Sequence, residues 1–314
     1  MYHFHIYEKE AMDFVNTLSV DELIQLSSGD PGKAQGGNLG AAGISVPGSA
    51  GETNVCAVEK GLASIVLADG PAGLPGERYY QYCTAISVGT LLAQTWDTEL
   101  IKSIGHMIGE EMIHYGVTLW LAPGMNIHRN PLCGRNFEYY SEDPVITGKI
   151  AAAMIDGVQE NKGCGTTIKH FACNNQEDNR MGSDSIVSER ALREIYLRGF
   201  EIAVKESQPM AIMTSYNLIN GVHAANNYDL CTNVARNEWG FKGLIMTDWT
   251  TTEIDESCTA AGCMRAGNDL VMPGCFGDRE NLKKELSDGT LDIKDLKVCI
   301  ARLANICFKS NQYE

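Results

Sequence analysis

The sequence predicts an α/β protein of the (β/α)8 TIM-barrel type, with a barrel that is incomplete or irregular. Three observations lead to this fold class. From about residue 62 onward, short apolar runs alternate with segments of helical spacing. The runs are unbroken rather than alternately polar and apolar, as strands buried on both faces require. The alternation fills most of the 314 residues, and one barrel of this type commonly takes ~250 residues.

Seven apolar runs are candidate strands. Five are clear, and they cover residues 64–68, 117–121, 165–168, 210–213 and 243–246. A weaker sixth covers residues 269–272, and a seventh lies near residues 85–88. Because an eight-stranded ring needs one more, the pattern by itself allows either a closed barrel or an open parallel sheet.

Helices with recognisable ends lie between these runs. Asp97 is a suitable N-cap for a helix that stops at Gly116. Asp143 precedes Pro144, which fits a cap followed by proline at the first helical position. Ser188 begins a third helix, and residues 296–303 repeat the helical spacing near the end of the sequence. The apolar stripes of these helices are expected to pack on the sheet.

The chain divides into two parts by composition. Residues 1–60 are predicted to hold a leading helix over 13–26 and an irregular segment rich in Gly and Ser over 27–54. Residues 61–314 are predicted to form the barrel domain that carries the chemistry.

Charge and cysteine content limit the functional class. The net charge of −15 argues against nucleic-acid and anionic-membrane partners, which need clustered Lys and Arg. The eleven cysteines are scattered without a C-x-x-C pair, which favours free thiols in a reducing compartment. No apolar run has transmembrane length, and residues 1–10 lack signal-peptide character, so we expect a cytoplasmic protein.

Polar residues follow the strands at the point where each strand ends. They are Asp69 after the first run, Arg135 beyond the second, Lys169 and His170 after the third, Tyr216 after the fourth, and Asp248 and Trp249 after the fifth. The carboxyl ends of parallel strands converge on one mouth, where ligands bind. A charged residue beside a buried strand is costly unless it is paired or functional. One such residue would indicate a structural ion pair, but five strand ends together predict an active site.

The residue types at this mouth favour a sugar as the ligand. The sequence has no H-E-x-x-H metal motif, no G-x-S-x-G elbow and no phosphate-binding loop, and we expect no metal or cofactor. Carboxylates and cationic donors bind sugar hydroxyls, and an aromatic ring covers the apolar sugar face. A carboxylate among fixed cations is expected to stay ionised, and it can attack an anomeric carbon.

Four segments carry long motifs in a characteristic order. They are residues 69–73 (Asp-Gly-Pro-Ala-Gly), 134–144 (Gly-Arg-Asn-Phe-Glu-Tyr-Tyr-Ser-Glu-Asp-Pro), 169–180 (Lys-His-Phe-Ala-Cys-Asn-Asn-Gln-Glu-Asp-Asn-Arg) and 246–249 (Met-Thr-Asp-Trp). Together they resemble glycoside hydrolase family 3, in the form typical of its β-glucosidases. The resemblance covers roughly residues 60–275.

The resemblance implies a role for each of nine residues. Asp248 would be the catalytic nucleophile, and Asp69 would bind hydroxyls on the far side of the sugar. The donors around that sugar would be Arg135, Lys169, His170 and Arg180, while Met213 and Tyr216 would line the pocket and Trp249 would supply an apolar wall. For each donor the alternative is an ion pair that only positions a carboxylate, and Arg180 fits either role equally well.

The sequence departs from the family pattern in two ways. The family's glucosidases usually continue the first motif with Leu-Arg, whereas this chain has Leu74-Pro75, so Arg78 is a candidate substitute for the missing donor. The family's general acid is a Glu on a separate α/β sandwich domain, and the sequence after residue 275 is too short for one. The acid is therefore expected from a separate sandwich domain or subunit, with this chain as an excised or naturally split barrel.

Other arrangements within and beyond the family are less well supported. Its N-acetylglucosaminidases use an Asp-His pair in the loop after the Lys-His strand, but here that loop has Asp178 and Asp184 without a His. The sequence thus predicts a retaining, exo-acting β-glycosidase of the β-glucosidase type that acts on β-linked glucosides. One alternative is a sugar-binding barrel with little turnover, because its acid is missing. A weaker one is an aldolase in which Lys169 forms a Schiff base.

Overall fold

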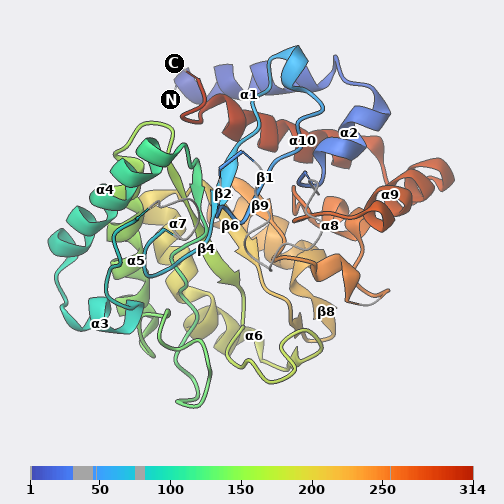
Figure 1. Ribbon diagram of the computed structural model, residues 1–314. Coiled ribbons are helices and arrows are strands. Elements are labelled where there is room, and N and C mark those ends of the chain that lie inside the picture. Colours follow the sequence, from blue (N-terminus) through green and yellow to red (C-terminus); the bar gives the residue numbers. More distant parts are fainter. Residues whose placement is uncertain (1, 31–44, 47, 75–81, 255, 314) are drawn as a thin grey trace.

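The computed structural model describes residues 2–30, 45–46, 48–74, 82–254 and 256–313 (Figure 1). The α-helices are α1 (Tyr2–Val15), α2 (Val20–Leu26), α3 (Gly89–Gln94), α4 (Thr98–Tyr115), α5 (Pro144–Gln159), α6 (Glu189–Ala191), α7 (Arg198–Ser207), α8 (Ala260–Ala266), α9 (Phe276–Asp288) and α10 (Ile293–Phe308). The strands are β1 (Gly51–Glu52), β2 (Val66–Ala68), β3 (Leu119–Trp120), β4 (Gly165–Phe171), β5 (Asp184–Ser185), β6 (Ala211–Thr214), β7 (Leu218–Ile219), β8 (Val222–His223) and β9 (Leu244–Met246). Short 3-10 segments are η1 (Val58–Lys60), η3 (Ala224–Asn226) and η5 (Thr251–Glu253), and π-helical segments are η2 (Leu192–Tyr196) and η4 (Asp229–Glu238).

The central sheet has six strands in the order β1-β2-β3-β4-β6-β9. All its neighbours are parallel except β1 and β2, which are antiparallel. The five clear strand predictions each overlap one of its strands, so they are confirmed. Isolated bridges continue the sheet beyond this ladder: Met246 pairs with Leu270, Ser28 with Val271, and Gly29 with Thr53. The predicted strand at 269–272 is therefore present only as isolated β-bridges at residues 270 and 271. The regular hydrogen-bonded ladder is a curled sheet of six strands and not a ring of eight.

Residues 85–88 do not form the predicted seventh strand. This segment has no strand partner among the described residues, and Val88 is instead the extended residue that precedes α3. The Ile86 N–H donates to the carbonyl of Ala72, which is a loop contact rather than part of a ladder. Ser87 and Val88 are exposed. The β-branched residues here have the composition of a strand, but they are not buried on both faces as a central strand must be.

Four predicted helix ends are confirmed, and the leading helix differs. Asp97, Asp143 and Ser188 each cap a helix through their side chains, and Gly116 adopts the left-handed conformation after α4. The single helix expected over residues 13–26 is two helices, α1 and α2. Ser19 and Glu22 form a capping box that begins α2 and separates it from α1.

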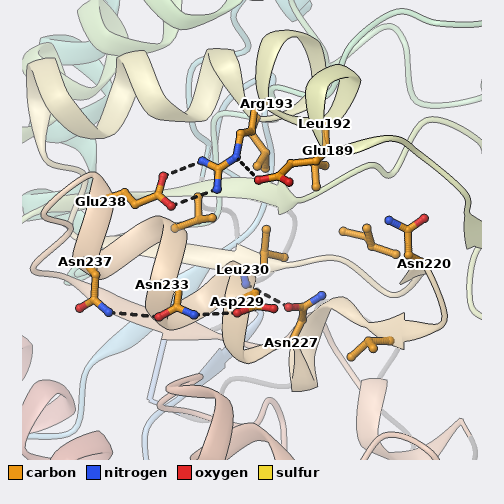
Figure 2. Close-up of a pocket in the computed structure, with 14 residues that line it drawn as sticks. Glu189, Leu192, Arg193, Asn220, Asn227, Asp229, Leu230, Asn233, Asn237 and Glu238 are labelled. Carbon is orange, nitrogen blue, oxygen red and sulfur yellow. Dashed lines mark hydrogen bonds and ion pairs between the residues drawn. The ribbon is translucent and has the colours of Figure 1, made fainter.

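A second, three-stranded sheet of β5, β7 and β8 borders a cavity of about 700 Å³ (Figure 2). Its charged side chains are paired with one another. Arg193 donates to Glu238 at 2.6 and 3.0 Å and to Glu189 at 3.0 Å. Asn237, Asn233 and Asp229 continue as a hydrogen-bonded row along η4. These pairings leave little reactive chemistry in this cavity.

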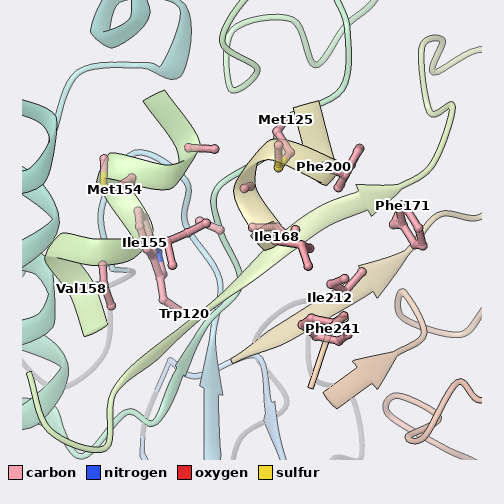
Figure 3. Packing of buried hydrophobic residues seen from close by; sticks show 14 of the residues in the cluster. Trp120, Met125, Met154, Ile155, Val158, Ile168, Phe171, Phe200, Ile212 and Phe241 are labelled. Atoms are coloured by element: carbon pink, nitrogen blue, oxygen red, sulfur yellow. The ribbon is translucent and has the colours of Figure 1, made fainter. Parts of the chain in front are cut away.

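One apolar core lies between the sheet and the helices α4, α5 and α7 (Figure 3). Ile155 of α5 and Trp120 of β3 are both buried and lie close together between helix and strand. Ile168 and Phe171 of β4 lie toward Phe200 of α7. Burying one such side chain contributes roughly 1.5–3 kcal/mol relative to leaving it exposed. This packing holds β3, β4 and β6 rigidly beneath their carboxyl ends.

A second core joins α1, α2, α8 and α10 to the other strands of the sheet. Ala11, Val15, Leu23 and Leu296 are buried in it, and α1 lies alongside α10 (Figure 1). Residues from both parts of the composition-based division therefore share one core. Within the described ranges no helix is both long and apolar enough to cross a membrane. The cytoplasmic location stays a prediction.

Candidate active site

A cavity of about 160 Å³ lies at the carboxyl ends of the central strands. Its lining residues are Ala50, Asp69, Leu121, Arg135, Lys169, His170, Arg180, Met213, Tyr216, Asp248 and Trp249. All nine site residues singled out from the sequence are in this set. The fold thus brings together side chains at or beyond the carboxyl ends of β2, β3, β4, β6 and β9, with Lys169 and His170 inside β4 rather than after it.

Lys169 and Asp69 form an ion pair across the floor of the cavity. The Lys169 Nζ lies 2.8 Å from Asp69 Oδ1. The lysine side chain is 3% exposed and the aspartate side chain 45%, so the carboxylate reaches outward from a buried cation. Burial acts to raise the pKa of Asp69, but the charge and hydrogen bond of Lys169 outweigh it and lower the pKa. Asp69 is therefore held as an ionised hydrogen-bond acceptor.

Asp248 is buried, and one of its carboxylate oxygens has no hydrogen-bond partner among the described residues. Its Oδ1 accepts from the backbone N–H of Trp249 at 2.7 Å. Its Oδ2 has no hydrogen-bond partner in the described parts of the chain, and the nearest cationic candidate, His170 Nε2, is 3.7 Å away. Burial raises the pKa of Asp248 above its usual value, although the charges of Arg135 and Lys169 oppose this. The sequence suggested the opposite direction from the cations alone, because burial depth was not visible in it.

His170 is fixed at both its backbone and its ring. Its N–H donates to Asn126 Oδ1 and its carbonyl accepts from Asn126 Nδ2, both at 2.8 Å. Its ring Nδ1 lies 3.1 Å from the hydroxyl of Tyr139. Burial, together with the charges of Arg135, Lys169 and Arg180, lowers the pKa of His170 well below its usual value. The imidazole is therefore neutral in the empty site.

The two arginines are each held by a glutamate. Arg135 Nε donates to Glu138 Oε1 at 2.5 Å. Arg180 Nη1 donates to Glu177 Oε2 at 3.0 Å, and its guanidinium lies 4.9 Å from the centre of the Tyr216 ring. Arg180 thus lines the cavity and is ion-paired with a glutamate outside the lining, so its role as a sugar donor stays a prediction.

Tyr216 and Trp249 form the apolar side of the cavity. The Tyr216 hydroxyl donates to the carbonyl of Trp249 at 2.9 Å, which ties the end of β6 to the residue after Asp248. Burial, and then the negative charge of Asp248, raise the pKa of Tyr216. The Trp249 Nε1 is buried without a hydrogen-bond partner among the described residues. Met213 lies beside them in the lining.

Sequence reasoning missed several residues of the site. Ala50 and Leu121 line the cavity without any chemical signal. Tyr139 and Asn126 contact His170, and the motif around Tyr139 was quoted without giving that residue a role. Arg78, the proposed substitute donor, lies outside the described residues. No group of three potential His, Cys, Asp or Glu metal ligands occurs in the part of the chain that the structure describes.

Known proteins have sequences similar to that of this chain. The family described as glycosyl hydrolase family 3, N-terminal domain, matches residues 65–306. Beta-glucosidase A of Butyrivibrio fibrisolvens is 42% identical over 286 residues, which are 91% of this chain and 32% of that protein. The exo-alpha-(1->6)-L-arabinopyranosidase of Bifidobacterium longum is 44% identical over 229 residues, which are 70% of this chain and 30% of that protein.

Solved structures agree with the sequence comparison. Beta-glucosidase 3B of Thermotoga neapolitana, in complex with α-D-glucose, superposes with a TM-score of 0.86 at 43% identity and covers 94% of this chain and 42% of that one. This chain spans about a third of the length of the two curated relatives above. The family match covers most of the chain, so the chain belongs to glycosyl hydrolase family 3 and contains its N-terminal domain.

Proposed function

We propose that this chain is the sugar-binding and nucleophile-bearing part of a retaining, exo-acting β-glycosidase of the β-glucosidase type. The observation that carries the proposal is the Asp248 Oδ2, which has no hydrogen-bond partner among the described residues and lies beside His170. The small cavity around this oxygen is lined by Arg135, Lys169 and Arg180. A buried carboxylate oxygen without a partner is costly in a purely structural role. Relatives named as β-glucosidases support the choice of substrate.

The chemistry follows from the position of Asp248. Its Oδ2 forms a bond to the anomeric carbon while the bond from that carbon to the leaving oxygen breaks, and a general acid gives that oxygen a proton. Water then attacks the same carbon, its proton passes to the general acid that the first step left deprotonated, and the bond from the carbon to Asp248 Oδ2 breaks. The sugar is released with its original anomeric configuration. Arg135 and Lys169 favour the ionised carboxylate that the first step needs.

The other lining residues have the properties needed to hold one pyranose ring. Asp69 offers acceptor oxygens and its partner Lys169 offers a donor, so together they suit a pair of adjacent hydroxyls. Trp249 provides an apolar face for the ring carbons. The small volume of the cavity favours a single terminal sugar, which is what exo action requires.

The general acid is proposed to come from a separate domain or subunit. The carboxylates in the described lining are Asp248 and Asp69. The pKa of Asp69 is lowered, and a general acid needs a pKa close to the operating pH. The relatives are about three times longer than their matched part, so they have room for a further domain.

We also propose that the central sheet belongs to a closed, irregular barrel. The bridges Met246–Leu270, Ser28–Val271 and Gly29–Thr53 lead from the β9 edge back toward β1. Closure of this kind would explain why the polar strand ends surround one cavity.

Hydrolysis of two substrates tests the proposed function. An activated aryl β-glucoside needs little acid assistance, whereas cellobiose needs much more. We expect this chain to release the aryl group faster than it hydrolyses cellobiose, and Asp248→Asn to abolish both reactions. An aryl α-L-arabinopyranoside, suggested by the name of one relative, serves as the competing sugar.

Two results would contradict the proposal. Glucose binding without any turnover or covalent glycosyl-enzyme would favour the sugar-binding barrel, which the missing acid also allows. Borohydride trapping of a carbonyl substrate on Lys169 would favour an aldolase. Its ion pair with Asp69 at 2.8 Å argues against this, because a Schiff-base nucleophile must be an uncharged amine.

A further inference from the structure

A hydrogen-bonded chain of four side chains leads from the rim of the cavity to the back of the His170 ring. Arg180 pairs with Glu177 at 3.0 Å, and Glu177 Oε1 accepts from Asn174 Nδ2 at 3.1 Å. The same Asn174 Nδ2 lies 3.0 Å from the Tyr139 hydroxyl, which lies 3.1 Å from His170 Nδ1. Tyr139 and His170 are both almost fully buried, so water does not compete for these bonds.

The direction of each hydrogen bond follows from the Arg180–Glu177 ion pair at one end of this series of side chains. A carboxylate paired with Arg180 can only accept, so the Asn174 group facing Glu177 is its amide N–H2. The second proton of that N–H2 is then donated to the Tyr139 oxygen. Burial raises the pKa of Tyr139, so its hydroxyl keeps its proton. That proton is free to be donated to His170 Nδ1.

From this chain we propose that Tyr139, oriented by Asn174, is a positioning residue that fixes His170 as the tautomer protonated on Nε2. A neutral imidazole carries one proton, and a ring nitrogen that accepts a hydrogen bond cannot also hold it. The proton is therefore on Nε2, which is the nitrogen that faces the cavity at 3.7 Å from Asp248 Oδ2. His170 consequently presents a hydrogen-bond donor to the site rather than an acceptor.

The tautomer itself does not depend on the proposed function, and only the catalytic use of the Nε2–H donor rests on it. With a sugar bound, the Nε2–H is available to a sugar oxygen or to the free Asp248 oxygen, both of which accept. The opposite tautomer would place a lone pair against the Asp248 carboxylate, which is repulsive at this distance. Tyr139 thus acts on the reaction through His170 and need not touch the substrate.

Nitrogen NMR of the histidine rings tests the tautomer without any substrate. The chain labelled with 15N-histidine is compared with His170→Gln, whose missing signals identify His170. We expect the wild type to show a protonated Nε2 and an unprotonated Nδ1 at neutral pH. A ring protonated on Nδ1, or on both nitrogens, would overturn the proposal whether or not the chain hydrolyses glycosides.

Tyr139→Phe tests the part played by the hydroxyl, and Tyr140→Phe is the matched control. Tyr140 is the next residue, is also buried and packs in the apolar core. We expect Tyr139→Phe to mix the two tautomers and to lower kcat/KM for an aryl β-glucoside by about threefold to tenfold, the worth of one hydrogen bond. Tyr140→Phe should leave the His170 signals and the rate unchanged. Unchanged His170 signals in Tyr139→Phe, or a shifted tautomer with an unchanged rate, would each refute the role of Tyr139.

Discussion

Asp269 and Asp248 are buried at opposite ends of the same part of the sheet. They differ in whether hydrogen bonds satisfy both carboxylate oxygens. Asp269, at the start of the segment that bridges to β9, is fully buried, and both its oxygens are occupied. Arg236 donates to it at 2.5 Å, Arg302 at 3.0 Å and the backbone N–H of Ile245 at 2.9 Å. Asp248, which follows the carboxyl end of β9, has one satisfied oxygen and one without a hydrogen bond to the described residues.

The difference separates a structural carboxylate from the one that we propose reacts. Charge and burial alone do not distinguish them, because both aspartates are buried near two cations. What differs is whether hydrogen bonds satisfy every oxygen. A saturated carboxylate stabilises the fold and cannot attack, whereas an unsaturated one weakens the fold and is available for chemistry.

The largest expected effect comes from Asp248→Asn, which keeps the shape of the side chain and removes its nucleophilic oxygen. We expect kcat for an aryl β-glucoside to fall on the order of 10⁴-fold or more. The N–H of Trp249 can still donate to the asparagine oxygen, so the fold should remain. Steady-state kinetics and far-UV circular dichroism measure the two outcomes, and wild-type activity in the variant would remove Asp248 from the mechanism.

The stability of this variant should also depend on pH in a definite direction. Burial raises the pKa of Asp248, so the folded state holds its proton more tightly than the unfolded state, where the pKa is about 3.9. The wild type therefore loses stability as the pH rises from that value through the folded pKa. We expect Asp248→Asn to match the wild type in acid and to exceed it at neutral pH in urea unfolding. A variant less stable than the wild type at pH 7 would make Asp248 a structural residue.

Asp269→Asn is expected to cause a large loss of stability and no direct loss of catalysis. Removing this charge leaves Arg236 buried and only partly compensated, which typically costs ~3–5 kcal/mol. Urea unfolding measures the loss. Any fall in activity should follow the unfolded fraction, since Asp269 does not line the cavity. A folded, fully stable variant would show that its two arginines find other partners.

The smallest effect is expected for an exposed ion pair. Lys149 and Glu206 lie 2.7 Å apart with side chains 53% and 43% exposed. Pairs of this kind contribute little, so Lys149→Ala should change the free energy of unfolding by no more than about 1 kcal/mol. This variant calibrates the other two. If Lys149→Ala lost as much free energy of unfolding as Asp269→Asn, burial would not be the reason why the two ion pairs differ.

Much of the site could be predicted because its chemistry is local in the sequence. Asp69, Lys169 and Asp248 each lie at the end of an unbroken apolar run, and parallel strands bring such ends together. The same logic found β2, β3, β4, β6 and β9. It failed at residues 85–88, where a β-branched pattern exists without a neighbouring strand in the described chain.

The remaining features depend on three-dimensional packing that no local pattern records. The pKa of Asp248 rises because of how deeply the side chain is buried, and burial depth is a tertiary property. The contact of Tyr139 with His170 joins two segments that are distant in the sequence, and Asn174 of the second segment also bonds the Tyr139 hydroxyl. The break between α1 and α2 could have been found locally, since Ser19 and Glu22 have the spacing of a capping box.

The bridge between Ser28 and Val271 has a consequence for how the molecule folds. It joins segments from distant parts of the sequence, and so does the apposition of α1 with α10. Closing such long loops is entropically unfavourable until the contacts that reward it have formed. The segments that complete the sheet are therefore among the last to be ordered, and catalytic competence should return on refolding later than most of the helical signal.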